Sequence, residues 1–394
     1  MRAVGRAGRA RAPGRTVGPC RAAEWPGVEA VPSVGPKPRT LGGSGLEVSE
    51  VGIGCWSWGD RQFWNDGCAP SPFVSPTTTF PPSRRDRADA RPTTTRRSWD
   101  AGNADRAQQA FEGAMASGMT WFDTAEVYGT KQFGAEDSEA LLGRFIREHG
   151  GAERAVVATK FAALPWRFGP SSVVSACKGS LERLGVDQLD LYQLHWPGLW
   201  GNVGYIDGLA ACVNEGLTKS VGVSNYSAKR VREAHAQLAK QGVHLASNQV
   251  QYNILYRAPE ANGVLDACRD LGVAVVAYCP LSQGVLTGKY DKANRPSGPR
   301  AVSYTETFFE EAEPLFQVMG ELAEKYGKTR AQVAIRWLLD VDPLVIPIPG
   351  AKTAEQVAEF RGAFGWELDE GEVLELRRLG ERVTPIQGFP VETW

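Results

Sequence analysis

The chain has 394 residues, of which 42% are apolar, and its 44 Lys and Arg residues nearly balance its 45 Asp and Glu residues. This length and apolar content predict a globular protein with a packed core, and the net charge of −1 gives no indication of a nucleic-acid partner. Seven scattered cysteines without a C-x-x-C motif, and only four histidines, argue against a disulfide framework and against a metal site. No apolar run approaches the roughly 20 residues that span a membrane, so we expect no membrane partner.

The first 39 residues differ in composition from the rest of the chain. Six Arg residues precede the first acidic residue, Glu24, and Ala, Gly and Pro fill much of the remainder. An Arg-rich, acid-poor leader resembles an organelle transit peptide, although Ser is scarce for one. We therefore predict a disordered transit peptide over residues 1–39 and a chloroplast location, with the mitochondrion or the cytoplasm as alternatives, and a single domain over residues 40–394.

Within this domain, eight short β-rich runs alternate with segments of helical periodicity. Most of the runs are apolar nearly throughout, as expected for parallel strands covered on both faces. One helical segment opens on Thr329 as a capping residue and then repeats apolar residues at helical spacing. The predicted strands are Val51–Cys55, Met119–Asp123, Ala155–Lys160, Leu189–His195, Ser220–Ser224, Ala246–Gln251, Ala274–Cys279 and Leu344–Pro347.

Eight similar β–α units without a break predict an α/β fold of the (β/α)₈ TIM-barrel type. A doubly wound open sheet is the alternative. Ahead of the first unit, Thr40–Leu41 and Leu46–Val48 flank a Gly-rich turn, which predicts an N-terminal β-hairpin that caps the barrel floor.

A low-complexity segment interrupts the first β–α connection at about residues 67–99. It contains six Pro, six Thr and six Arg and has no apolar periodicity, so it lacks the surface needed to order itself. It is either a disordered surface loop or a stretch wrongly retained in the transcript, and both interpretations stay open.

Polar residues close most of the predicted strands. In a barrel, the carboxyl ends of the strands form the functional rim. Each residue alone has a plain structural explanation, such as a salt bridge for a Lys or a turn for an Asn. Burying all of them together without a function would cost desolvation free energy that nothing offsets. The residues expected at this rim are Asp123, Tyr128, Lys160, His195, Ser224, Asn225, Gln249 and Tyr278.

Six motifs, in the same order along the chain, resemble the aldo-keto reductase family, and they are most similar to its plant and algal plastid members. They cover about residues 40 to 380 and read Phe-Asp-Thr-Ala-Glu-Val-Tyr-Gly at 122–129, Thr-Lys at 159–160, Leu-His-Trp-Pro at 194–197, Gly-Val-Ser-Asn-Tyr at 222–226, Gln-Val-Gln-Tyr-Asn at 249–253 and Ile-Pro-Gly-Ala-Lys-Thr at 348–353. The resemblance implies a soluble enzyme that reduces aldehydes or ketones to alcohols by hydride transfer.

The resemblance also implies a role for each member of a catalytic set. Tyr128 is the general acid, Lys160 lowers the pKa of Tyr128, Asp123 holds Lys160, and His195 orients the carbonyl group of the substrate. A phenol with a pKa of about 10 needs such a neighbouring cation to donate a proton efficiently near neutral pH.

A hydride must come from a cofactor, and the usual dinucleotide fingerprint is missing at Gly52–Ser57. Barrels often bind phosphate with the loops after their seventh and eighth strands. The resemblance implies NADPH or NADP⁺, with Tyr278 stacked on the nicotinamide and Lys352 at the 2′-phosphate of the ribose. The residues it implies for cofactor binding are Ser224, Asn225, Gln249, Tyr278, Leu281, Ser282, Gly284, Lys289, Gly350, Lys352 and Gln356.

By position, Trp56, Trp58 and Trp196 are expected to line the substrate pocket, and Trp166 to join an aromatic rim suited to planar carbonyl compounds. Two other functions are weighed beside the reductase. One is an NADPH-binding regulatory subunit with little turnover, and the other is a barrel hydrolase that uses Asp123 and Glu126 as paired acids.

Overall fold

The computed structural model describes residues 35–60, 101–129, 137–150, 154–199 and 202–386. The predicted low-complexity segment and nearly all of the predicted leader lie outside the described residues. Strand β1 begins at Pro38, two residues before the predicted start of the domain at residue 40.

Eight parallel strands form one sheet whose spatial order is the order of the chain. Because no reversal interrupts this order, a doubly wound sheet is excluded. The two edge strands also meet: the amides of Gly52 and Gly54 donate to the carbonyls of Pro347 and Pro349 at 3.0 Å each, so the sheet closes and the predicted barrel is confirmed. The strands are β3 (Ile53–Gly54), β4 (Trp121–Asp123), β5 (Val156–Phe161), β6 (Leu189–Leu194), β7 (Thr218–Ser224), β8 (Leu245–Gln251), β9 (Ala274–Tyr278) and β10 (Val345–Pro347).

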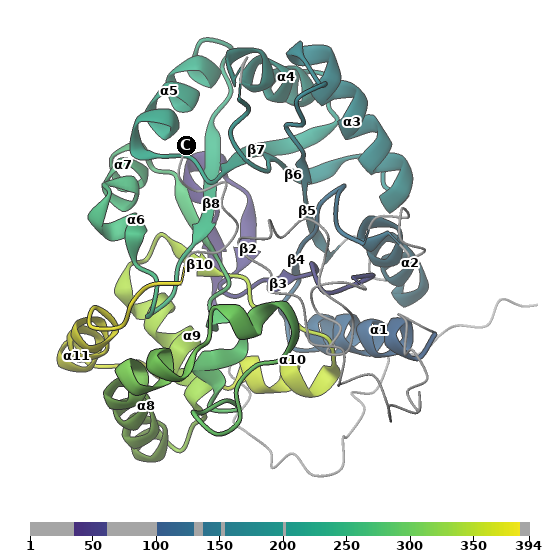
Figure 1. Ribbon diagram of the computed structural model, residues 1–394. Coiled ribbons are helices and arrows are strands. Elements are labelled where there is room, and N and C mark those ends of the chain that lie inside the picture. Colours follow the sequence, from purple (N-terminus) through teal and green to yellow (C-terminus); the bar gives the residue numbers. More distant parts are fainter. Residues whose placement is uncertain (1–34, 61–100, 130–136, 151–153, 200–201, 387–394) are drawn as a thin grey trace, which may run out of the picture. The chain divides into compact units, whose positions relative to one another are not determined.

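Helices surround the strands and connect each to the next (Figure 1). They begin and end at ordinary signals: Asp137 and Ser227 cap α2 and α5, and Thr329 forms a capping box with Gln332 at the start of α9. The helices are α1 (Ala101–Ala116), α2 (Ser138–His149), α3 (Gly169–Leu184), α4 (Asn202–Asn214), α5 (Ala228–Ala239), α6 (Ala258–Ala261), α7 (Val264–Leu271), α8 (Glu306–Tyr326), α9 (Arg330–Val341), α10 (Ala354–Arg361) and α11 (Glu370–Gly380). Across the described helices, none is both long and apolar enough to cross a bilayer.

The apolar core has two parts. The larger part lies between the strands and the helices, and the smaller part fills the barrel interior. The interior part gathers side chains from six barrel strands and from the N-terminal hairpin: Leu41, Val48, Trp121, Ala158, Leu191, Ala246, Ala274, Val276, Ile346 and Ile348.

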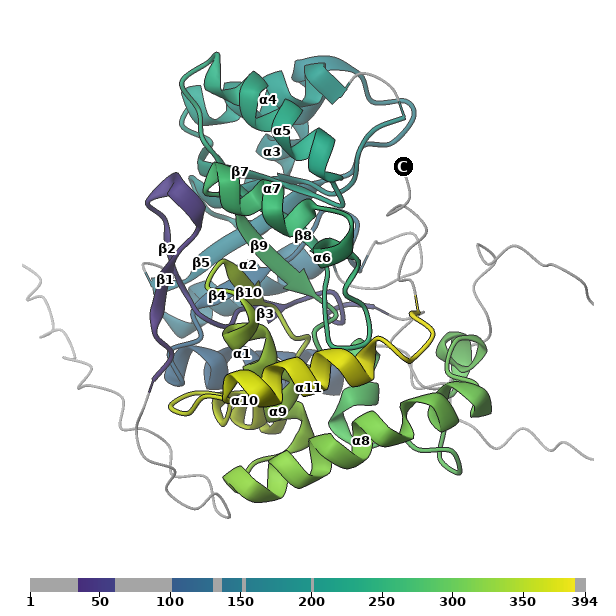
Figure 2. The same ribbon diagram turned by 90° about the vertical axis from the view of Figure 1, so that its left-hand side faces the viewer.

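The predicted hairpin is confirmed, with strands β1 (Pro38–Thr40) and β2 (Glu47–Ser49) paired antiparallel a few residues from the expected bounds. Figure 2 shows it at the left of the barrel. Its turn sits against the barrel floor, where the amide of Gly43 donates to the Gly272 carbonyl at 2.8 Å, just before β9. Gly42 has a φ of 55°, and a Cβ there would lie 2.5 Å from the Ala246 carbonyl, so only glycine fits this close approach.

Leu41 is fully buried and carries the contact between hairpin and barrel interior. We expect Leu41→Ala to lower the free energy of unfolding by about 2–5 kcal/mol, because it removes buried methyl groups and leaves a cavity. Leu374, which is 50% exposed on α11, provides the control, and Leu374→Ala should change stability by no more than about 0.5 kcal/mol. Urea unfolding measures both; equal effects would show that the hairpin does not plug the barrel.

Candidate active site

A buried ion pair lies at the carboxyl end of the barrel strands. The ammonium group of Lys160 is fully buried, and it donates to Asp123 Oδ1 and, at 2.8 Å, to the Thr124 carbonyl. The second oxygen of Asp123 accepts hydrogen bonds from Gln249 at 2.8 Å and from Gln193 at 3.1 Å. Both charges are therefore paired and hydrogen-bonded, which is what burial of an ion pair requires.

Tyr128 lies directly above this pair. Its hydroxyl oxygen is 3.4 Å from Lys160 Nζ and 3.3 Å from His195 Nε2, so the three groups meet at one point. The loop that carries Tyr128 turns back on itself, with the Tyr128 amide donating to the Ala125 carbonyl at 3.0 Å. The structure thus brings together all four residues of the predicted catalytic set.

The net shift in the pKa of the Tyr128 phenol is opposite in direction to the predicted lowering. Desolvation of the phenol, reinforced by the negative charge of Asp123, raises the pKa of Tyr128 well above its ordinary value. Burial also lowers the pKa of Lys160, although its pairing with Asp123 opposes that shift. The phenol therefore keeps its proton throughout the neutral range.

His195 follows β6 and stays neutral. Burial, with the nearby charge of Lys160, holds the pKa of its imidazole well below the ordinary value. Its Nδ1 atom is buried and finds no hydrogen-bond partner among the described residues, whereas its Nε2 faces the Tyr128 hydroxyl. A neutral imidazole at this point can exchange a hydrogen bond with a small polar group placed beside the phenol.

Next to this centre, the predicted nicotinamide residues form one hydrogen-bonded chain. The Tyr278 hydroxyl donates to Asn225 Oδ1 at 3.1 Å, and Asn225 Nδ2 donates to Ser224 Oγ and to the His195 carbonyl, both at 3.2 Å. Ser224 in turn donates to the Gln249 carbonyl at 2.8 Å. The Gln249 side-chain amide points instead to Asp123, so within this set Gln249 holds the ion pair.

The loop after β9 carries Leu281, Ser282, Gly284 and Lys289, and it has an unusual backbone. Ser282, Gln283 and Gly284 all have positive φ angles, between 47° and 92°. Such conformations in residues other than Gly cost about 1–3 kcal/mol each and gather at ligand-binding sites. Successive amides in turns of this kind can form concavities that bind anions.

Two residues that hold this loop in shape are not predicted from the sequence. Arg300 Nη1 donates to the Gln283 carbonyl at 3.2 Å, and the Tyr304 hydroxyl donates to the Ser282 carbonyl at 2.9 Å. Both side chains are buried, yet they lie in a Pro- and Gly-rich stretch without periodicity. Gln193 also escaped, although a polar residue inside the apolar run of β6 was a usable signal.

The loop after β10 adds a helix N-terminus to the same end of the barrel. Gly350 bridges to Gly54, and Lys352 immediately precedes Thr353, whose hydroxyl caps α10. The Gln356 side chain accepts a hydrogen bond from the Lys352 amide at 2.7 Å. A cationic side chain beside a helix N-terminus suits a phosphate group.

The tryptophans divide between rim and core. Trp56 stacks on Tyr128 with ring centroids 6.0 Å apart, and Trp196 lies 4.6 Å from the His195 ring, so both border the site. Trp166 is 71% exposed. The expectation for Trp58 is wrong: it is fully buried against Phe145 and its indole donates to the Ala351 carbonyl at 2.7 Å, which makes it part of the core.

Glu126 does not form an acid pair with Asp123. Its carboxylate accepts hydrogen bonds from Arg167 and, at 2.6 Å, from the Ala162 amide, while Asp123 is paired with Lys160. Both carboxylates are committed to cationic partners, which argues against the paired-acid hydrolase. A metal-binding group of three or more His, Cys, Asp or Glu residues is not found in the part of the chain that the structure describes.

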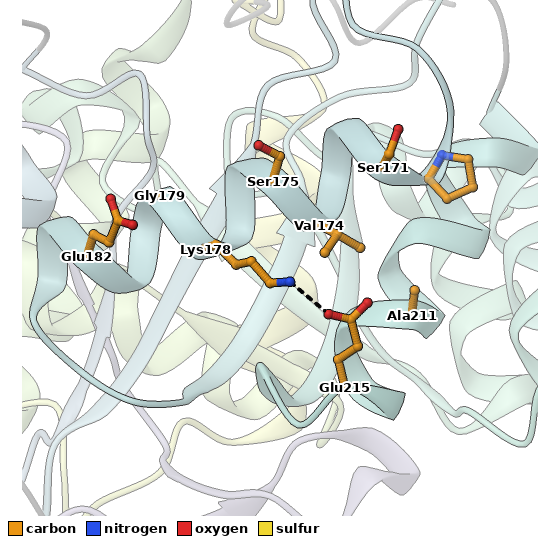
Figure 3. A pocket seen from close by; sticks show the side chains of 9 residues that line it. Ser171, Val174, Ser175, Lys178, Gly179, Glu182, Ala211 and Glu215 are labelled. Atoms are coloured by element: carbon orange, nitrogen blue, oxygen red, sulfur yellow. Dashed lines mark hydrogen bonds and ion pairs between the residues drawn. The ribbon is translucent and has the colours of Figure 1, made fainter.

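A groove of about 710 Å³ lies elsewhere, on the outer side of α3 and α4. Figure 3 shows Lys178 and Glu215 reaching toward one another across it, with 3.0 Å between the ammonium and the carboxylate. No residue of the catalytic set lines this groove. This groove is therefore separate from the predicted site at the strand ends.

Comparisons with known proteins agree with this geometry. The Aldo/keto reductase family model matches residues 93–381. A chloroplastic pyridoxal reductase of Arabidopsis thaliana is 36% identical over 84% of this chain and 83% of its own length. Among solved structures, a thermostable aldo-keto reductase in complex with the inhibitor epalrestat is 26% identical, with a TM-score of 0.64 over 87% of this chain and 99% of its own. An aldo-keto reductase of Klebsiella pneumoniae in complex with NADPH is 25% identical, with a TM-score of 0.62 over 88% and 98% of the two chains.

The buried ion pair leads to a stability prediction. Lys160→Met leaves the Asp123 carboxylate buried without its cation, and we expect the free energy of unfolding to fall by about 3–5 kcal/mol. The double variant Asp123→Asn, Lys160→Met removes the orphaned charge as well and should regain much of that loss. Urea unfolding of the two variants beside the unsubstituted protein measures the difference; a double variant no more stable than the single one would contradict the account.

The pKa of His195 gives stability a pH dependence. Because the folded-state pKa lies below the unfolded value of about 6.5, the unfolded chain binds more protons at acidic pH, and folding becomes less favourable as the pH falls from there toward the folded-state pKa. His195→Gln has no group that titrates at this position. The stability advantage of the unsubstituted protein over the variant should therefore shrink below pH 6.5 by up to about 1.4 kcal/mol per pH unit. Chemical unfolding of both proteins at a series of pH values tests this, and a constant difference would overturn it.

Proposed function

Because the chain belongs to the aldo/keto reductase family, we propose that it is an NADPH-dependent reductase that converts aldehydes or ketones to alcohols, with Tyr128 as the proton donor. One observation carries the proposal. The Tyr128 hydroxyl lies within 3.4 Å of both a buried, carboxylate-paired Lys160 and a neutral His195. A protonated phenol and a neutral imidazole side by side can hold a carbonyl oxygen and deliver a proton to it.

The donor groups along the strand ends support a dinucleotide cofactor. Asn225 and Tyr278 would hold the nicotinamide end, the loop from Leu281 to Lys289 would meet the diphosphate, and Lys352 with the N-terminus of α10 would meet the 2′-phosphate. The chemistry of these residues fits the cofactor. The Asn225 amide can hydrogen-bond to the carboxamide of the nicotinamide, and the backbone amides and the Lys352 cation suit the phosphate groups. When bound, the reduced nicotinamide supplies a hydride to the carbonyl carbon.

Each residue of the set then has one task in reduction. Tyr128, which is protonated at neutral pH, donates its proton to the oxygen that gains negative charge. His195 Nε2 positions that oxygen by a hydrogen bond. Lys160, fixed by Asp123, lies near enough to stabilise the phenolate left on Tyr128 until solvent returns a proton.

The relatives and the leader support a first substrate and a first location to test. Trp56 and Trp196 beside the site suit a planar or apolar carbonyl compound. The Arabidopsis relative is named a chloroplastic pyridoxal reductase, so pyridoxal is the first substrate to test and a plastid the first location to test. The Arg-rich residues 1–39 are proposed as the transit peptide for that location.

Tyr128→Phe tests the proposal. We expect the rate of NADPH oxidation with pyridoxal or another aldehyde to fall by about 10²–10⁴-fold, because the variant has no proton to donate. NADPH affinity, measured by quenching of protein fluorescence, should stay within about twofold, since the phenol is not one of the proposed cofactor contacts. Tyr326→Phe, which removes a hydroxyl that bonds to Glu372 far from the site, is the matched control and should keep full activity.

Turnover that survives in Tyr128→Phe would refute the assigned proton donor. Tight NADPH binding by the unsubstituted protein without turnover on any aldehyde would favour the regulatory subunit instead.

A further inference from the structure

We propose that Glu126 and Arg167 are a positioning pair, which locks the loop that carries Tyr128 onto the loop that follows Lys160 and thereby sets the rate of carbonyl reduction. The inference rests on the proposed function, because it takes Tyr128 as the proton donor. Neither residue is assigned to the catalytic set, and neither touches the reacting groups.

Glu126 stands between two loops. Its side chain is only 7% exposed, and one of its oxygens accepts hydrogen bonds from both the Arg167 guanidinium and the Ala162 amide. Ala162 is the second residue after Lys160 and the first after β5. Glu126 is itself two residues before Tyr128, so one carboxylate bridges the chain segments that carry the phenol and the ammonium group.

Arg167 is in turn fixed on three sides. Its guanidinium donates to the Ala162 carbonyl at 3.3 Å as well as to Glu126, and it lies 5.2 Å from the centre of the Phe161 ring. The Arg167 carbonyl accepts a hydrogen bond at 2.6 Å from the Tyr205 hydroxyl on α4. The bridge is therefore anchored to the strand end and to a helix outside the barrel.

Thr124, the first residue after β4, donates its backbone amide to the Ala158 carbonyl of β5 at 2.9 Å, but beyond it the backbone holds the Tyr128 loop only weakly against β5. The direct backbone bond there, from the Glu126 amide to the Lys160 carbonyl, is long at 3.4 Å. The two bonds of the Glu126 carboxylate are charge-assisted, which makes them shorter and stronger than neutral ones. They join the two loops beyond Thr124, where the remaining backbone contact is long.

Position matters at this site because the Tyr128 hydroxyl lies between two groups at 3.3 Å and 3.4 Å. A displacement of about 1 Å at a reacting group can cost on the order of 10²-fold in rate. Loss of the bridge should therefore lower kcat and leave NADPH binding intact, since the proposed cofactor contacts belong to other strands.

The experiment compares Glu126→Ala, Glu126→Gln and Arg167→Ala in NADPH-dependent reduction of pyridoxal or another aldehyde. We expect Glu126→Ala to lower kcat by about 10–100-fold while the Kd for NADPH stays within about twofold. Glu126→Gln keeps a carbonyl oxygen for the Ala162 amide and should recover kcat to within about tenfold of the unsubstituted protein. The double variant Glu126→Ala, Arg167→Ala should lose little more than Glu126→Ala, because the two residues act as one unit.

A matched control separates positioning from general stability. Asp342, also 7% exposed, pairs with Arg269 at 2.6 Å near the amino end of β10, on the far side of the barrel from Tyr128. Arg269→Ala breaks a comparable ion pair and should leave kcat unchanged. Thermal unfolding of all variants verifies that the assays are run on folded protein.

The outcomes distinguish this inference from the proposed function. Unsubstituted protein that turns over while Glu126→Ala keeps its kcat would overturn the positioning pair and leave the reductase standing. Glu126→Gln as slow as Glu126→Ala, or Arg269→Ala as slow as either, would also overturn it. If the unsubstituted protein shows no turnover on any aldehyde, the proposed function is refuted, and this inference, which rests on it, is refuted as well.

Discussion

The burial of a lysine charge inside a closed barrel is the constraint on which the site depends. Lys160 cannot be moved out of water at acceptable cost without Asp123, and Asp123 needs Gln193 and Gln249 to satisfy its second oxygen. These side chains come from four strands, so the ion pair forms only when the barrel has closed around it. One pleat below, at two residues earlier in the respective strands, Trp121, Ala158 and Leu191 belong to the apolar interior. The polar layer thus rests on a packed apolar layer, and this arrangement keeps it rigid.

Much of this could be predicted from the sequence, because the barrel repeats one local signal eight times. Each apolar run followed by a polar residue marked a strand end, and the closed sheet then brought Asp123, Lys160 and His195 to one rim. Trp56 and Trp58 show where such reasoning stops. At a spacing of two they would share a face in a strand, but they lie in a turn after β3, and Trp58 enters the core while Trp56 stacks on Tyr128.

Other features depend on contacts between distant parts of the chain, which no local pattern reports. Arg300 and Tyr304 support the loop after β9 from a segment some twenty residues later, and nothing in their immediate sequence points to that role. The direction of the shift in the Tyr128 pKa could not be predicted from the sequence for a similar reason. A nearby cation predicts a lower pKa for Tyr128. The sequence does not show how deeply the phenol is buried or that Lys160 is paired with Asp123; both follow only from the packed site.

The raised pKa of Tyr128 defines what the proposed chemistry requires of its neighbours. A phenol with its ordinary pKa of about 10 is already protonated at neutral pH, so burial adds no proton and instead opposes formation of the phenolate, and the proposed task of Lys160 is to stabilise that phenolate when it forms. The loops at the ends of β7 and β9 also hold backbone strain. Positive φ angles occur there at Asn225, Cys279, Ser282 and Gln283. Buried partners such as Arg300 and Tyr304 hold that strain in place before any ligand arrives. The packed fold thereby stabilises the strained loop conformations, and the apolar layers below them provide the rigid support that this requires.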